Sequence, residues 1–162
     1  MTWSLRRINE TDVDWIYEAC QDPLIQQWTM VPRPYTREHS INFTRDLAGE
    51  LAVWAILKLG TERPLGVISV HRISDCDAMA DIGYWMAPWG RGLGGMKPAL
   101  TLLIAELRGW GNVAGIQATI AESNLASRRS VESAGFELLG DSDRNCRCGD
   151  EEVSAVTYEL RI

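Results

Sequence analysis

The sequence lacks the residues that a metal centre or a disulfide framework requires. It contains only two histidines, His39 and His71, and its cysteines form no Cys-x-x-Cys pair. A zinc site needs four ligands at suitable spacing, and this pattern does not supply them. We therefore predict that the protein holds no metal and that its cysteines are free thiols. The cysteines are Cys20, Cys76, Cys146 and Cys148.

Clusters of basic residues and long hydrophobic runs are also missing. Lys and Arg occur only in short pairs such as Arg6-Arg7, and the net charge is −6. A nucleic-acid partner would require a basic face. No apolar run reaches the roughly 18 residues of a membrane span, and the first residues lack the basic and apolar regions of a signal peptide. We therefore expect no nucleic-acid partner, no membrane and a cytoplasmic location.

The composition is that of an ordinary globular protein. Hydrophobic residues make up 46% of the 162 residues and charged residues 23%, which is enough apolar material for a substantial core. No repeat, low-complexity tract or linker divides the chain. We predict that residues 1–162 form a single domain.

The most informative stretch is rich in glycine and lies between a predicted strand and a predicted helix. Residues 82–86 are apolar and aromatic, and Pro88 follows them, which predicts a buried strand. Apolar residues recur at helical spacing from 96 to 107, and Pro98 falls in the first turn, where a missing N–H costs nothing. Four glycines lie between the two elements: Gly90, Gly92, Gly94 and Gly95.

This turn places the unpaired N–H groups of about Leu93 to Lys97 at the positive end of a helix dipole. Such a helix start is a ready site for phosphate oxygens. Two alternatives stay open. The glycines could serve only the backbone path of a tight turn, or the spacing of Gly90, Gly92 and Gly95 could be a dinucleotide fingerprint with Glu122 as the ribose acid.

The order of the other predicted elements bears on these alternatives. Strands are predicted over 4–9, 51–59, 64–73, 115–121, 136–139 and 153–160, and further helices over 11–20, 36–48 and 124–135. Residues 24–35 are predicted to be irregular and 140–152 to be a polar loop. A doubly wound nucleotide fold should alternate strand and helix from its start. Here a hairpin precedes the glycine-rich stretch, so the dinucleotide interpretation becomes a distant alternative.

The glycine-rich stretch resembles the acyl-coenzyme A loop of the GNAT superfamily of N-acetyltransferases. Gly92 and Gly94 match the two small positions of that loop, and Trp89 stands where Gln or Arg is usual. That tryptophan and the preceding Ile-Gly-Tyr-Trp resemble the RimJ/RimL branch, which acetylates the N-termini of ribosomal proteins.

A second segment carries the same resemblance. Asn124 and Ser127 match the Asn-x-x-Ser of this branch, and Gly135-Phe136 matches the Gly-Phe that ends the following helix. The resemblance therefore spans nearly the whole chain. For Asn124 and Ser127, the alternative is an ordinary helix N-cap and a first-turn hydroxyl.

The resemblance implies an α+β (mixed α/β) fold. Its central sheet is mostly antiparallel and seven-stranded, with splayed fourth and fifth strands, and helices flank it. The implied reaction is direct attack of a primary amine on acetyl-CoA, the co-substrate, in a ternary complex. A non-catalytic acyl-CoA-binding regulatory module is the alternative, and either protein is compatible with a homodimer.

The resemblance also implies roles for individual residues. Ser127 would protonate the leaving thiolate, and a carboxylate near the splay would accept a proton from the amine. Asp81 and Glu122 are the nearest candidates for that base, with an ordinary solvated charge as the alternative for each. Coenzyme A contacts are implied for Trp85, Met86, Ala87, Arg91, Gly92, Leu93, Gly94, Gly95, Met96, Lys97, Asn124 and Ser127.

The acceptor amine would enter between residues 24–35 and the loop 140–152. The first wall offers Trp28, Met30 and Tyr35, and the loop is rich in carboxylates. This combination suits a cationic amine through cation–π and charge attraction, at a peptide N-terminus or on a small molecule. Two alternatives stay open. The carboxylates can be no more than the solvated face of a surface loop. Tyr84 is a further candidate for the lining of the acceptor site, but a tyrosine in a strand can equally be a packing residue.

Overall fold

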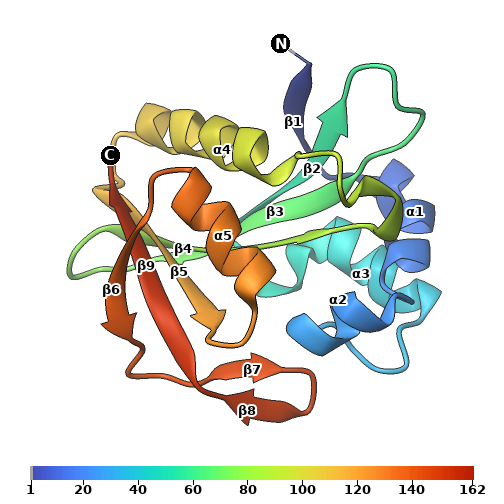
Figure 1. The fold of residues 1–162 in the computed structure, drawn as a ribbon. Helices are drawn as coiled ribbons and strands as arrows, with labels where there is room; N and C mark the ends of the chain where they lie inside the picture. Colours follow the sequence, from blue (N-terminus) through green and yellow to red (C-terminus); the bar gives the residue numbers. More distant parts are fainter. Residues whose placement is uncertain (1) are drawn as a thin grey trace.

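A seven-stranded sheet forms the centre of the computed structural model, which describes residues 2–162 (Figure 1). Its strand order is β1-β2-β3-β4-β5-β9-β6. The strands are β1 (Trp3–Arg7), β2 (Ala52–Lys58), β3 (Gly66–Ile73), β4 (Met79–Met86), β5 (Gly115–Ala121), β6 (Glu137–Asp141) and β9 (Ala155–Arg161). All neighbours are antiparallel except β4 and β5, which are parallel. The predicted mixed, mostly antiparallel seven-stranded sheet is confirmed.

Strands β4 and β5 part after three residue pairs. Met79, Ala80 and Asp81 pair with residues 115–117, whereas β4 stays paired with β3 as far as Met86. The predicted splay is therefore confirmed, and it opens a gap along the second half of β4.

The backbone groups that face this gap follow from the alternation of an antiparallel ladder. Met79 accepts from Ser74 N–H at 2.9 Å, and Ala87 donates to Leu65 C=O at 2.9 Å, so odd-numbered residues of β4 bond to β3. The even-numbered Tyr84 and Met86 then direct their N–H and C=O groups into the gap. We had expected the groups around Trp85 to Ala87 there, but the N–H of Ala87 is already used.

Helices cover both faces of the sheet (Figure 1). The helices α4 (Met96–Trp110) and α5 (Leu125–Ser133) pack with even-numbered β4 residues such as Ile82 and Tyr84. The helices α1 (Val13–Ala19), α2 (Pro23–Trp28) and α3 (Arg37–Asp46) lie on the other face, with Trp85 and Ala87. Short 3-10 turns are η1 (Glu10–Asp12), η2 (Leu47–Gly49) and η3 (Pro88–Gly90). Within residues 2–162, none of these helices has the length and hydropathy needed to cross a bilayer.

The chain before β2 departs from the prediction at two helix starts. The helix predicted over 11–20 begins earlier than expected, because Asn9 and Asp12 form a capping box that opens η1, and η1 precedes α1. Residues 24–35 are not irregular throughout. Asp22 accepts hydrogen bonds from the N–H groups of Leu24 and Ile25, and Pro23 occupies the first turn of α2, where proline is favoured.

The predicted loop 140–152 contains a separate hairpin, β7 (Cys146–Cys148) and β8 (Glu151–Val153). Gly149, with a φ of +63°, permits the tight turn between them. Elsewhere the predictions hold to within a few residues. β5 occupies 115–121, as predicted, whereas β4 begins at Met79 rather than Ile82.

Asp12 joins the first strand to the first helix. The residue is 1% exposed. Its carboxylate accepts from Arg6 Nη2 at 2.7 Å, Trp15 Nε1 at 2.7 Å and Asn9 N–H at 2.9 Å. Burial alone would raise the pKa of Asp12, but the bonds from Arg6, Trp15 and Asn9 outweigh it and lower the pKa below its usual value. The ionised form is therefore part of the native packing.

We expect Asp12→Asn to lower the free energy of unfolding by about 2–4 kcal/mol, because Arg6 and Trp15 lose a charged partner. The matched control is Asp14→Asn, which removes an exposed pair with Arg37 and should cost less than about 1 kcal/mol. Because the pKa of Asp12 is lowered by folding, its contribution should be full above about pH 4 and lost as the pH falls further. Urea unfolding from pH 7 to pH 3 measures both effects, and equal losses in the two variants would contradict this account.

Candidate functional site

The four glycines of the loop between β4 and α4 have two different roles. Gly92 and Gly94 adopt φ values of +75° and +70°, in the left-handed region that glycine favours. A Cβ at either would meet nothing within 4 Å, so the loop is open there. At Gly90 a Cβ would lie 2.2 Å from Leu65 O, and at Gly95 it would lie 2.6 Å from the Trp3 ring. The loop is therefore fixed by close packing at both ends and open in the middle.

Helix α4 begins directly behind this opening. Its N-cap is Gly95, and no side chain caps it. The N–H groups of Met96 and Lys97 therefore have no intrahelical acceptor, and they stand at the positive end of a 15-residue helix. Such a start can hold the oxygens of a pyrophosphate.

The side chains beside the loop are less available than the sequence suggests. Arg91 pairs with Asp22, the N-cap of α2, and its Nη1 lies 3.2 Å from Asp22 Oδ2. Arg91 holds the pKa of Asp22 below its usual value. Trp89 donates to Pro64 C=O at 2.9 Å and lies under Arg63, so it is a packing residue. Arg91 thus joins the loop to α2, whereas Lys97 and Leu93 are exposed.

Tyr84 and Ser127 meet on the α5 side of the gap. The Tyr84 hydroxyl lies 2.8 Å from Ser127 Oγ and 3.0 Å from Ser127 O. Asn124 is the N-cap of α5, and its Oδ1 accepts from Ser127 N–H at 3.2 Å. Burial raises the pKa of Tyr84 to about 12, so its hydroxyl stays protonated at neutral pH. The structure thus brings together three residues that the sequence had assigned to three different roles.

The two carboxylates considered as bases lie apart. Asp81 occupies the last position at which β4 pairs with β5, and its Oδ2 lies 3.7 Å from Arg72 Nε. Glu122 follows β5 and is exposed; its N–H donates to Ser154 C=O at 2.9 Å. A cavity of about 430 Å³ lies beside Glu122, lined also by Ser123, Val153 and Ser154. Among the described residues, the hydrogen-bond partners of Ser127 on this side are Tyr84 and Asn124, and neither carboxylate bonds to it.

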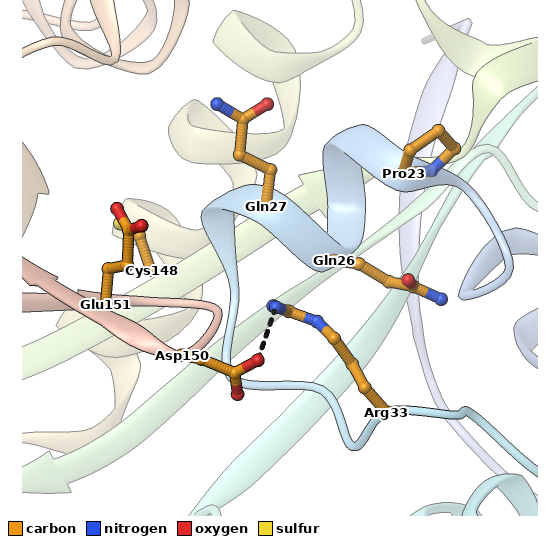
Figure 2. A pocket seen from close by; sticks show the side chains of 7 residues that line it. All are labelled: Pro23, Gln26, Gln27, Arg33, Cys148, Asp150 and Glu151. Carbon is orange, nitrogen blue, oxygen red and sulfur yellow. Dashed lines mark ion pairs between the residues drawn. The ribbon is translucent and has the colours of Figure 1, made fainter.

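The two expected walls of the acceptor site do meet. Gly149 N–H donates to Thr29 C=O at 3.2 Å, so the β7–β8 hairpin contacts the end of α2. Between them lies a cavity of about 440 Å³ (Figure 2). Its lining residues are Pro23, Gln26, Gln27, Arg33, Cys148, Asp150 and Glu151.

The aromatic lining that we expected does not face this cavity. Tyr35 is buried against α1 and α3, Met30 is 72% exposed, and Trp28 is half-buried without lining the cavity. The reason is helix α2, which presents Gln26 and Gln27 instead. The signal for this was the pair Asp22-Pro23, which begins a helix as readily as it ends one.

No group of three or more His, Cys, Asp or Glu side chains arranged to hold a metal ion occurs among the residues that the structure describes. Cys146 and Cys148 lie side by side on β7 with their sulfurs 3.8 Å apart, as free thiols.

Comparison with known proteins gives one family match. A model described as an acetyltransferase (GNAT) domain matches residues 4–137. No curated protein matches the sequence significantly.

Several solved structures share the fold. RimL, the ribosomal L7/L12 α-N-protein acetyltransferase, in complex with coenzyme A, has a TM-score of 0.87 at 20% identity, with 100% of this chain and 95% of that chain covered. The acetyltransferase that modifies the N-terminal serine of L7/L12 in Salmonella typhimurium has 0.82 at 22%, with 100% and 96% covered. The aminoglycoside acetyltransferase AAC(6')-Ib, with coenzyme A and kanamycin, has 0.80 at 22%, with 99% and 95% covered.

The two ends of α4 provide a matched test of the loop. Gly94 and Gly111 both adopt left-handed φ values, +70° and +72°, and a Cβ at either would meet nothing within 4 Å. We expect Gly94→Ala and Gly111→Ala to lower the free energy of unfolding equally, by about 1–2 kcal/mol. Only Gly94→Ala should weaken coenzyme A binding, by about tenfold or more, because its methyl group stands over the open turn. Calorimetry measures the affinity, and an unchanged dissociation constant in folded Gly94→Ala would refute this phosphate site.

Proposed function

The chain belongs to the GNAT acetyltransferase family, whose model covers residues 4–137, and from this membership we propose that it transfers the acetyl group of acetyl-CoA to a primary amine by direct attack in a ternary complex. Such a transfer requires four things of the protein: alignment of amine and thioester, stabilisation of the developing oxyanion, removal of a proton from the amine, and return of a proton to sulfur.

The gap between β4 and β5 supplies the alignment and the oxyanion donors. Tyr84 and Met86 direct backbone N–H groups into it, as their register requires. A thioester carbonyl lying in the gap would accept from one of them, and the amides of a pantetheine arm would pair with the remaining groups of the strand edge. The pyrophosphate would then reach the N–H groups of Met96 and Lys97, where the opening at Gly92 and Gly94 leaves room.

The observation that carries the proposal is the contact of Tyr84 with Ser127. The phenol donates its single proton to Ser127 C=O at 3.0 Å, which leaves its oxygen to accept from Ser127 Oγ at 2.8 Å. This bond holds the serine hydroxyl beside the gap. Rotation about one bond redirects that O–H to a thiolate, so Ser127 is the general acid and Tyr84 its positioning residue.

The acceptor site is the cavity between α2 and the β7–β8 hairpin (Figure 2). Arg33 Nη1 lies 3.8 Å from Asp150 Oδ2, which leaves Glu151 as the carboxylate with no cationic partner among the lining residues. The two glutamines offer amide donors and acceptors. A cationic amine, at a peptide N-terminus or on a small molecule, fits this lining.

Membership of the RimJ/RimL branch is supported by Asn124, Ser127 and the Ile-Gly-Tyr-Trp of β4, and by the likeness in fold to RimL. The relatives' acceptors, a ribosomal protein and kanamycin, both present amines, in keeping with this proposal. A single domain over residues 1–162, a cytoplasmic location and a homodimer stay predictions.

Thiol release from acetyl-CoA, measured across peptide N-termini, polyamines, aminoglycosides and amino acids, tests the function. We expect turnover with at least one class of amine. Ser127→Ala should lower kcat by roughly 10²-fold, in the range of a lost proton donor, with the affinity for coenzyme A unchanged. The matched control is Ser130→Ala on the same helix, whose hydroxyl donates only to Ala126 C=O. Coenzyme A binding without turnover of any amine would favour the regulatory module instead.

The acceptor site makes a separate prediction. Glu151→Gln should raise the KM for a cationic acceptor by about two- to fivefold with little change in kcat, because a partly exposed charge contributes below about 1 kcal/mol. Glu152→Gln, the neighbour that does not line the cavity, is the control. The difference should shrink above 0.1 M salt, where charges are screened over about 10 Å. Equal KM values for both variants would show that the amine enters elsewhere.

A further inference from the structure

His71 lies on β3, next to the point where β4 parts from β5, and its ring occupies space that Gly83 of β4 leaves open. The register of β3 and β4 shifts between Val70 and Arg72, and this irregularity includes His71. A Cβ at Gly83 would lie 2.6 Å from His71 Nε2 and 2.7 Å from its Cε1. The imidazole therefore rests directly over the Gly83 backbone, in space that any larger residue would fill.

Glu50, which follows η2, fixes the orientation of this ring. Its Oε2 lies 2.5 Å from His71 Nδ1. A carboxylate at Nδ1 places a proton there and leaves Nε2 as the basic nitrogen of the neutral ring. Nε2 is also the ring atom nearest to Gly83, so the basic nitrogen is next to β4, the strand that borders the gap.

The position of Gly83 relates His71 to the reacting atoms. Gly83 belongs to the part of β4 that has no β5 partner. At about 3.3 Å per residue, it lies roughly 3 to 10 Å along the strand from Tyr84 and Met86, whose N–H groups face the gap. Side chains alternate, so Tyr84 reaches Ser127 on the α5 face while His71 lies on the opposite face, toward α1 and α3.

We propose that His71, oriented by Glu50, accepts the proton of the attacking amine from the face opposite Ser127. This inference rests on the proposed function and supplies the base that the sequence left open. As the nitrogen–carbon bond forms and the carbon–sulfur bond breaks, His71 Nε2 takes a proton from nitrogen, directly or through one water, and Ser127 Oγ gives one to sulfur. The His71 side chain is 43% exposed, so it can return its proton to solvent.

The charges around His71 suit this role. Burial alone would lower the pKa of His71 and Arg72 acts in the same direction, but the hydrogen bond and charge of Glu50 and the charge of Asp81 outweigh both and raise it. Asp81, paired with Arg72 at 3.7 Å, thus acts through its charge on the imidazole. A general base is most effective when its pKa lies near the working pH, and these charges raise the pKa of His71 above its usual value, in that direction.

The pH dependence of kcat/KM tests this assignment. In the wild-type protein it should rise with pH to a plateau, with a midpoint above about 6.5, because only neutral His71 accepts a proton. Glu50→Gln removes a group that raises the pKa, so it should move the midpoint to lower pH. His71→Gln should lower kcat by about 10²-fold and abolish this rise, and added imidazole should restore part of the rate.

His39 is the matched control, since it is the other histidine of the chain and caps α3 through its bond with Thr36 N–H at 3.1 Å. His39→Gln should leave the rate and the midpoint unchanged. Wild-type kcat and midpoint in His71→Gln would overturn the inference while leaving the acetyltransferase intact. If His71→Gln does not fold, an unmoved midpoint in Glu50→Gln overturns it. Absence of acetyl transfer by the wild-type protein would instead reject the proposed function, and this inference with it.

Discussion

The parting of β4 from β5 is the constraint on which the rest of the structure depends. A strand edge inside a protein leaves polar backbone groups that cost about 1–3 kcal/mol each when nothing pairs with them. After Asp81, the even-numbered residues of β4 have such groups, because β3 pairs only with the odd-numbered ones. The gap therefore favours a ligand that carries amides and a carbonyl along its length. Tyr84 spans the same gap with its side chain and so joins the sheet to α5.

The glycine-rich loop at the end of the gap is open in its middle but fixed in position at its ends. Gly90 and Gly95 allow contacts with Leu65 and Trp3 that no larger residue would permit. Arg91 joins this loop to Asp22 at the start of α2. One wall of the cavity beside α2 and the glycine-rich turn therefore share a charged contact, so a displacement of one would also move the other.

Local signals predicted the parts of the chain that local chemistry determines. Pro98 placed the start of α4, and Asn124 marked that of α5, because caps and first-turn prolines act within a few residues. The helix α2 was missed, and residues 24–35 were expected to be irregular, because Asp22-Pro23 can end one helix and begin another. The hairpin at 146–153 escaped detection because its short polar strands carry no hydrophobic alternation. The contacts of Tyr84 with Ser127 and of Glu50 with His71 join residues 43 and 21 positions apart, and no periodicity reports such distances.

The β7–β8 hairpin stands outside the main sheet and pairs only with itself. It meets the other wall of the cavity through the hydrogen bond from Gly149 N–H to Thr29 C=O and through the ion pair of Asp150 with Arg33. Because the hairpin pairs with no strand of the main sheet, substitutions of its side chains leave the register of β4 and β5 unchanged. This division separates the lining of the cavity from the geometry of the sheet, so that one can change while the other is kept.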